Sequence, residues 1–246
     1  MRPGIRTETF AGLTVRIAGG RDGRGGGDGP LVCLLHGFGA PGDDLVPLAE
    51  ALESRGVLRF AFPAAPIELA MGWWEARAWW EIDVAELERT VAAGTFRDLE
   101  GRDPPELPRV RGQLLEALEG VQQALGVRPE QVVIGGFSQG AMLATDTFLA
   151  GERPFAGLAI LSGTFLAAER WRRLMGRRAG LPFFQSHGRS DPLLPFALAQ
   201  RLRDALAAAG LRPTWCDFPG GHQIPPAVVT RLAAFLHDVA AGGHRG

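Results

Sequence analysis

Three residue types are missing from this 246-residue sequence: it contains no lysine, no asparagine and no tyrosine, so all 26 of its basic residues are arginine. Without lysine there can be no Schiff-base amine and no phosphate-binding lysine of a P-loop. Without asparagine there is no Asn-X-Ser/Thr acceptor for glycosylation, and without tyrosine no phenol can serve as a catalytic acid or base. These absences exclude Schiff-base enzymes, P-loop nucleotide-binding proteins, N-glycosylated proteins and enzymes with a catalytic tyrosine.

Cysteine is also scarce, with only Cys33 and Cys216 present. Two cysteines cannot form a disulfide framework or a four-thiolate metal centre. Each lies in an apolar run, which predicts two buried, reduced thiols. The five histidines show neither an H-E-x-x-H nor a His-x-His spacing, so we expect no metal site and no other cofactor.

An excess of one charge is absent as well, because 26 basic residues oppose 27 acidic ones and the net charge is -1. Nucleic-acid-binding proteins usually carry a strong basic excess, so nucleic acid is not expected as a partner. No stretch approaches the ~18 uninterrupted apolar residues of a membrane helix. The N-terminal stretch lacks the apolar core of a secretory signal. We therefore expect a cytoplasmic protein without integral membrane association.

What the sequence does contain is an alternation of short apolar runs with longer amphipathic stretches. The expected strands lie at residues 31–35, 57–62, 132–137, 157–161, 182–185 and 214–218. The expected helices lie at residues 44–54, 107–125, 141–149, 165–178, 196–209 and 226–239. Apolar strands separated by amphipathic helices predict an α/β protein, with a mostly parallel central sheet covered by helices on both faces. Because no internal repeat or long linker is present, we expect a single domain over residues 1–246.

Residues 19–29 (GGRDGRGGGDG) interrupt the alternation near the N-terminus. A glycine-rich loop can bind phosphate, but this one has no GK[ST] sequence and no helical pattern directly after it. We interpret it as a flexible connection between strands.

Residues 63–108 interrupt the alternation again. Prolines cluster at both ends of this segment, and four of the six tryptophans lie inside it: Trp73, Trp74, Trp79 and Trp80. Excursions of this kind often border active sites, and we expect this one to do so. The tryptophans have two interpretations: they pack as core, or at least two of them line a groove for an acyl or aryl group.

Ser138 lies at the centre of residues 136–140, whose sequence GFSQG fits the pattern G-x-S-x-G. An apolar run precedes the motif and a helical pattern follows it, which is the strand–turn–helix setting of a nucleophile elbow. Side chains two residues before or after the serine would collide with the neighbouring strand and helix. The pattern therefore predicts that Ser138 is a nucleophile.

A serine hydroxyl is a weak nucleophile until a base removes its proton, and in this type of fold the acid and then the histidine follow the serine along the chain. His222 lies in a loop directly after the last expected strand. Asp191 follows the expected strand at residues 182–185, whereas other acids after Ser138 lie on expected helices or inside a strand. The predicted triad is Ser138, Asp191 and His222.

An oxyanion hole needs two N–H donors, one from the residue after the serine and one from a loop after an earlier strand. Gln139 supplies the first donor. Residues 36–39 (HGFG) follow the expected strand at 31–35, and the N–H of Phe38 is the second predicted donor. His36 itself is interpreted as a buried structural imidazole that hydrogen-bonds to the backbone.

Several motifs resemble, in order along the chain, those of the phospholipase/carboxylesterase family of α/β-hydrolases: LHGFG at residues 35–39, GGFSQGA at 135–141, LSG at 161–163, HGRSDPLLP at 187–195 and GH at 221–222. That family includes acyl-protein thioesterases and bacterial carboxylesterases. The resemblance implies the same triad and the same oxyanion donors. Residues 78–82 (AWWEI) are similar to a family segment near the catalytic serine that usually reads Trp-aromatic-Asp. Here Glu81 replaces the aspartate, and the extra pair Trp73–Trp74 precedes the segment.

These observations predict a serine carboxylesterase that hydrolyses short to medium acyl esters through an acyl-enzyme on Ser138. The expected partner is a small-molecule acyl ester or thioester. An acyl-protein thioesterase and a lysophospholipase are alternatives that differ in the leaving group, and a non-catalytic binding protein on a hydrolase scaffold is a remote one. The residues assigned to substrate binding are Trp73, Trp74, Trp79, Trp80 and Leu194.

Overall fold

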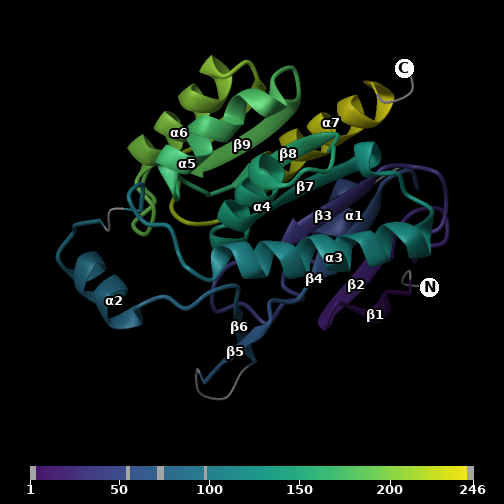
Figure 1. Cartoon of the computed structure of the whole chain (residues 1–246), viewed down its shortest axis with the longest axis horizontal. Coiled ribbons are helices and arrows are strands. Elements are labelled where there is room, and N and C mark those ends of the chain that lie inside the picture. Colours follow the sequence, from purple (N-terminus) through teal and green to yellow (C-terminus); the bar gives the residue numbers. More distant parts are fainter. Residues whose placement is uncertain (1–3, 54–55, 71–74, 97–98, 243–246) are drawn as a thin grey trace.

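The computed structural model describes residues 4–53, 56–70, 75–96 and 99–242 (Figure 1). Its centre is an eight-stranded sheet in the order β1-β2-β4-β3-β7-β8-β9-β10. Its strands are β1 (Arg6–Phe10), β2 (Leu13–Gly19), β3 (Leu31–Leu35), β4 (Arg59–Pro63), β7 (Val132–Phe137), β8 (Gly157–Leu161), β9 (Pro182–Gly188) and β10 (Arg212–Phe218). In this sheet the pairs β1–β2 and β2–β4 are antiparallel, and the remaining pairs are parallel. The predicted mostly parallel sheet is confirmed.

Helices cover both faces of the sheet, as Figure 1 shows. One apolar cluster packs four helices against the first face: α3 (Leu107–Leu125), α4 (Gln139–Ala150), α5 (Ala168–Met175) and α6 (Phe196–Ala208). A second cluster packs two helices against the other face: α1 (Leu48–Leu52) and α7 (Pro226–Gly242). Short 3₁₀ turns lie at η1 (Pro129–Gln131) and η2 (Gly176–Arg178). The strands are therefore buried on both sides, which explains their nearly continuous apolar sequences.

Two elements differ from the sequence prediction near the N-terminus. Residues 44–54 were predicted to be helical, but only α1 forms there. Pro47 has no amide hydrogen, and the chain before it makes a tighter turn in which Val46 N–H donates to Asp43 C=O at 3.0 Å. The edge strand β1 was not predicted, because its charged and polar side chains give it little apolar signal.

The glycine-rich residues 19–29 connect β2 to β3, as predicted, and a buried side chain binds part of this connection. Arg59 on β4 is only 1% exposed. Its guanidinium donates hydrogen bonds to the carbonyls of Gly29 at 2.6 Å, Gly27 at 2.9 Å and Leu125 at 2.8 Å. These three acceptors compensate for removing the charge from water. No local sequence pattern indicates that a central strand carries this side chain toward the loop.

The tryptophan-rich segment at residues 63–108 leaves the main sheet. It contains a small antiparallel hairpin of β5 (Ile67–Leu69) and β6 (Ala76–Ala78), followed by the helix α2 (Val84–Ala92). Figure 1 shows the hairpin and α2 standing apart from the layers of the main sheet. The sequence predicted the excursion but neither the hairpin nor α2.

Cys33 and Cys216 are both buried and unpaired, as predicted. Burial raises the pKa of the Cys33 thiol to about 12, so this residue stays a neutral thiol at ordinary pH. Within the described ranges, no helix combines the length and the apolar character needed to cross a bilayer.

Candidate active site

Ser138 occupies the turn that connects β7 to α4. Its backbone has a φ of 53° and a ψ of -118°, a conformation that residues other than glycine rarely adopt. The Ser138 N–H donates to the carbonyl of Leu161 on β8 at 2.9 Å, and the Ser138 carbonyl accepts from the N–H of Met142 at 3.1 Å. The turn leaves the serine partly exposed at the carboxyl end of a central strand.

The two glycines of the motif are required by close contacts around this turn. A Cβ at Gly136 would lie 2.6 Å from the carbonyl oxygen of Leu35, and a Cβ at Gly140 would lie 2.2 Å from the same atom. Both distances are far below van der Waals contact, so a side chain at either position would force β3 and α4 apart. The G-x-S-x-G spacing thus has a direct structural cause.

Asp191 and His222 meet in the loops that follow β9 and β10. The Nδ1 atom of His222 lies 2.7 Å from Oδ2 of Asp191, and Oδ1 of Asp191 accepts hydrogen bonds from the N–H groups of Leu193 and Leu194, both at 2.9 Å. Burial raises the pKa of the Asp191 carboxyl, but the hydrogen bonds from His222 and the two amides outweigh it, so the pKa lies below its ordinary value of 3.8. An ionised Asp191 holds the His222 proton on Nδ1 and leaves Nε2 free to accept one.

The three residues of the predicted triad follow strands that lie close together in the sheet. Ser138 follows β7, Asp191 follows β9 and His222 follows β10. The ring of Phe137, directly before the serine, lies 4.7 Å from the ring of His222. Because parallel strands end at the same edge, this arrangement gathers the nucleophile elbow, the acid and the histidine at one edge of the sheet.

A second histidine, His187, lies beneath the acid and was not assigned to the site by the sequence prediction. Its Nε2 is 2.9 Å from the carbonyl of Leu194 and 3.4 Å from Oδ2 of Asp191. Burial lowers the pKa of His187, which favours a neutral imidazole that donates from Nε2. The contact braces the loop that carries Asp191. The i, i+4 spacing of His187 and Asp191 was the available sequence signal.

The loop after β3 carries Phe38 past the serine. A Cβ on Gly37 would lie 3.4 Å from the Cβ of Ser138, so this loop and the elbow are in close contact. The last paired residues of β3 and β7 are Leu35 and Gly136. Phe38 and Gln139, the two predicted oxyanion donors, therefore lie equally far beyond the last pair of this ladder.

His36 is a buried structural residue, as predicted. Its Nε2 accepts a hydrogen bond from the N–H of Ala65 at 2.9 Å, and its Nδ1 lies 2.8 Å from the carbonyl of Gly37. These partners require a proton on Nδ1 and none on Nε2. Burial lowers the pKa of His36 from its ordinary 6.5 to about 4, although the hydrogen bond to Gly37 acts in the opposite direction.

Acidification is expected to destabilise the protein through His36. The unfolded chain takes up a proton near pH 6.5, whereas the folded imidazole stays neutral down to about pH 4. Its contribution is therefore complete above pH 6.5 and is lost as the pH falls toward 4, at about 1.4 kcal/mol per pH unit. Urea unfolding of the wild type and His36→Gln between about pH 7 and about pH 5 measures this slope. The variant should show the shallower dependence, and equal slopes would contradict the assignment.

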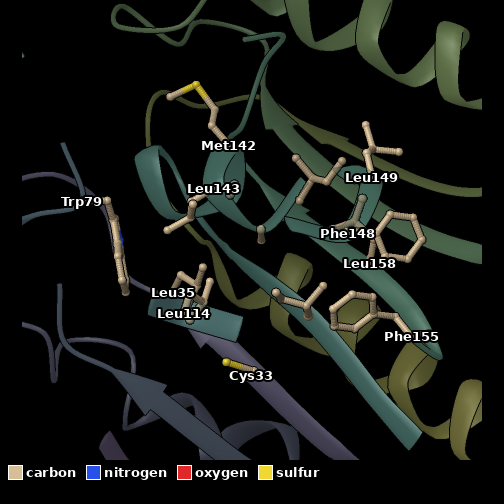
Figure 2. Packing of buried hydrophobic residues seen from close by; sticks show 14 of the residues in the cluster. Cys33, Leu35, Trp79, Leu114, Met142, Leu143, Phe148, Leu149, Phe155 and Leu158 are labelled. Carbon is tan, nitrogen blue, oxygen red and sulfur yellow. The ribbon is translucent and has the colours of Figure 1, made fainter. Parts of the chain in front are cut away.

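The aromatic residues assigned to substrate binding do not behave alike. Trp73 and Trp74 lie outside the described residues. Trp79 is fully buried, and Figure 2 shows its indole within the apolar cluster that also contains Leu35 and Leu143. The prediction that Trp79 lines a groove is wrong, because its ring has no exposed surface.

Leu194 also requires a correction. Its side chain is only 3% exposed and belongs to the apolar core. Its backbone, rather than its side chain, serves the site: the N–H donates to Asp191 and the carbonyl faces His187. The assignment of Leu194 to substrate binding is therefore not supported by its position.

A cavity of about 440 Å³ opens beside the start of α4, and its wall includes Trp80. Met142, one turn into α4 from Ser138, contributes to the same wall. Most of the lining comes from the excursion and from the loop before α5: Trp80, Glu81, Ile82, Asp83, Leu99, Arg102, Asp103, Pro104, Pro105, Glu106, Met142 and Leu166. Of these lining residues only Trp80 was predicted from the sequence to bind substrate. The others come together only where residues 80–83 and 99–106 pack beside α4.

Ion pairs and backbone bonds hold the far wall of this cavity. Arg170 on α5 pairs with Asp103 at 2.9 Å and with the fully buried Asp146 on α4 at 2.7 Å. The N–H of Ala167 donates to the carbonyl of Arg102 at 2.8 Å. The segment at residues 99–106 is thus anchored to the core helices beneath it.

A strand–serine–helix turn, with an acid and a histidine in loops after neighbouring strands of a mostly parallel sheet, defines the class: this protein is an α/β-hydrolase. The model of the phospholipase/carboxylesterase family matches residues 105–240. The chain belongs to that family, and it is an ester-hydrolysing enzyme of the serine hydrolase superfamily.

Relatives agree with this family assignment, and solved structures share the fold. A protein of Eremothecium gossypii named acyl-protein thioesterase 1 is 30% identical over 213 residues, which cover 82% of this chain and 85% of the relative. The protein of the same name from Emericella nidulans is 26% identical over 225 residues, which cover 87% and 92% of the two chains. The crystal structure of esterase PE8 matches with a TM-score of 0.75 at 23% identity, covering 92% of this chain and 99% of that one. The Bacillus cereus carboxylesterase matches with a TM-score of 0.67 at 22% identity, covering 92% and 94%.

Proposed function

We propose that this enzyme is a serine carboxylesterase that hydrolyses short to medium acyl esters through an acyl-enzyme on Ser138. The observation that carries the proposal is the 2.7 Å hydrogen bond between the buried Asp191 and Nδ1 of His222, at the sheet edge that also carries the elbow of Ser138. We also propose that the chain works as one domain, because one eight-stranded sheet contains both the first strand, β1, and the last strand, β10.

The proposed mechanism has two halves. Nε2 of His222 takes the proton from Oγ of Ser138 as Oγ attacks the ester carbonyl, and the N–H groups of Phe38 and Gln139 stabilise the oxyanion. The imidazolium then gives its proton to the departing alcohol, which leaves the acyl group on Ser138. In the second half His222 deprotonates water, and hydrolysis of the acyl-enzyme releases the acid and restores the serine. Asp191 stays ionised throughout and stabilises the imidazolium.

A fluorophosphonate probe tests the proposal, because it phosphonylates only a serine that a base has activated. We expect one probe per chain, attached to Ser138 in the tryptic peptide map, and no labelling of Ser138→Ala. A folded wild-type protein that remains unlabelled would contradict the proposal and favour a non-catalytic binding protein on this scaffold.

The cavity beside α4 is the proposed site for the acyl chain. Its volume of about 440 Å³ falls in the range of small-molecule sites, and apolar side chains such as Trp80, Leu99 and Met142 form much of its wall. Burying an acyl chain there would remove its methylene groups from water. Trp80 is thus the one described tryptophan of the excursion that we retain as a substrate-binding residue.

Shortening the cavity wall at Ile82 is expected to reduce the preference for longer acyl chains. Ile82 is half-buried and lines the cavity, and each methylene buried against it is worth up to ~0.8 kcal/mol. For Ile82→Ala we expect the ratio of kcat/KM for p-nitrophenyl hexanoate over acetate to fall by up to about tenfold. Val91→Ala on α2, where Val91 is 41% exposed and outside the cavity lining, is the matched control. The same ratio in Ile82→Ala and the wild type would reject this cavity as the acyl site.

A thioester substrate is the alternative that the relatives favour, since those described above are named acyl-protein thioesterase 1. The same mechanism cleaves an ester or a thioester, so the site geometry does not separate them. Comparing kcat/KM for p-nitrophenyl esters, a palmitoyl thioester and a lysophospholipid distinguishes the esterase from the thioesterase and the lysophospholipase. A preference for the palmitoyl thioester would replace the carboxylesterase assignment.

A further inference from the structure

The side chain of Gln139 hydrogen-bonds to residues 79 and 80, although the predicted oxyanion role of Gln139 needs only its backbone N–H. The residue is 1% exposed, and both polar atoms of its carboxamide make a hydrogen bond. Oε1 accepts a hydrogen bond from the N–H of Trp79 at 3.0 Å, and Nε2 donates one to the carbonyl of Trp80 at 2.8 Å. The carboxamide therefore binds the excursion as a neighbouring peptide group would, directly beside the nucleophile.

Trp79 extends this connection to the loop after β3. Its indole is fully buried, and Nε1–H donates to the carbonyl of His36 at 2.9 Å. The indole also lies 5.4 Å from the imidazole of His36, whose Nε2 is held by Ala65. His36, which begins the loop after β3 (residues 36–40, called the oxyanion loop below), is thus fixed through both its carbonyl and its ring.

The other end of the same loop is held by the strand that leads into Trp79. The N–H of Gly39 donates to the carbonyl of Arg77 at 2.9 Å, and the N–H of Arg77 donates to the carbonyl of Ala40 at 2.9 Å. These bonds form an antiparallel bridge between the loop and β6. Residues 77–80 consequently contact the chain on both sides of Phe38 and also contact Gln139.

We propose that the side chains of Gln139 and Trp79 are positioning residues that fix the distance between the two oxyanion donors. The inference rests on the proposed function, because it needs the N–H groups of Phe38 and Gln139 to act as those donors. The β3–β7 ladder cannot hold these groups itself, since its last pair is Leu35 with Gly136 and both donors lie beyond it. Residues 77–80 form the connection that the ladder lacks.

The spacing of the donors matters because stabilisation of an oxyanion depends on donors aimed at the position that the charged oxygen will occupy. A shift of either loop weakens binding of the tetrahedral species more than binding of the planar substrate. Loss of the connection should therefore lower kcat and leave KM nearly unchanged. A residue that served only stability would lower the melting temperature without this selectivity.

Two variants remove the connection, and one control removes a similar bond elsewhere. Gln139→Met keeps the length of the side chain but loses both hydrogen bonds, and Trp79→Phe keeps a ring but loses the bond to His36. Trp171→Phe is the matched control, because Trp171 is also fully buried and its Nε1 donates to Asp146 at 2.8 Å, within the α4–α5 packing. If Gln139→Met does not fold, Trp79→Phe carries the test, since it leaves both hydrogen bonds of the Gln139 carboxamide in place.

The measurements are kcat and KM for p-nitrophenyl acetate, and the affinity for a trifluoromethyl ketone relative to the matching methyl ketone. The serine oxygen adds to the carbonyl carbon of the fluorinated ketone and forms a tetrahedral oxyanion. The ratio of the two affinities therefore reports on the oxyanion hole. We expect Gln139→Met and Trp79→Phe to lower kcat and this ratio together, by about 10- to 100-fold, less than or close to the loss of a whole donor. Trp171→Phe should change both quantities by less than about threefold.

The outcomes separate the inference from the function on which it rests. If the folded variants keep the kcat and ketone ratio of the wild type while melting earlier, the positioning role is overturned and the triad assignment stands. The positioning role is also overturned if Trp171→Phe lowers the ratio as much as Trp79→Phe does. A wild-type protein that binds the fluorinated ketone no more tightly than the methyl ketone would overturn the proposed function together with the inference.

Discussion

Replacing Ser138 with alanine is expected to lower kcat for p-nitrophenyl acetate by up to about 10⁶-fold, as the loss of a triad nucleophile does in other serine hydrolases. The substitution deletes a single oxygen at a partly exposed position, so the melting temperature should change by no more than a few degrees. Steady-state hydrolysis by protein that is free of contaminating esterases measures the effect.

Ser162 provides a matched control for this experiment. It lies directly after β8, next to the nucleophile strand in the sheet, and it also has a positive φ of 49°. Ser162→Ala removes the same oxygen from a residue that also has a positive φ, and it should keep activity within about threefold of the wild type, since no proposed transition-state donor or nucleophile is lost. A Ser138→Ala variant that kept a tenth of the activity would show that another residue is the nucleophile.

Asp191→Asn should produce the second-largest loss, about 10⁴-fold in kcat. The asparagine can donate a hydrogen bond to Nδ1 of His222, so the imidazole would turn to the tautomer that carries its proton on Nε2. That tautomer cannot accept the proton of Ser138. The kinetics of purified variant and wild type above neutral pH give the comparison, because the wild-type carboxyl is fully ionised there.

Asp217 is the control for this second substitution. It lies on β10, five residues before His222, and its carboxylate pairs with Arg189 on the surface. Asp217→Asn removes one negative charge from the same region without touching His222, and kcat should change by less than about threefold, as for an exposed ion pair. Equal losses in the two variants would mean that Asp191 acts through the local charge and does not orient the imidazole.

The elbow was predictable because its motif and the apolar patterns on either side of it lie in one short stretch of sequence. Gly136 and Gly140 are demanded by contacts with Leu35, and the strand and helix on either side of Ser138 have strong apolar patterns. Asp191 and His222 could be assigned from order alone, because parallel strands end at one edge of the sheet and chain order limits which loops reach it. These residues needed no knowledge of long-range packing.

The cavity and the tryptophan segment were less predictable because they depend on packing across distant parts of the chain. Trp79 and Trp80 are adjacent and chemically identical, yet one is fixed between His36 and Gln139 while the other borders a cavity. The difference arises where β6 bridges the loop after β3, and composition carries no information about that contact. His187 was missed for a different reason: its hydrogen-bond partner is the backbone carbonyl of Leu194, which no residue type in the sequence reveals.

The backbone conformation of Ser138 has a consequence for the evolution of this protein. A positive φ at a residue other than glycine costs of order 1–3 kcal/mol, a large share of the stability of a typical domain. Selection for stability alone would favour glycine at this position, and only the need for a hydroxyl at the end of β7 opposes that change. In directed evolution for heat resistance without an activity screen, Ser138 should therefore be replaced early. The resulting protein should have a higher melting temperature and no longer hydrolyse substrate.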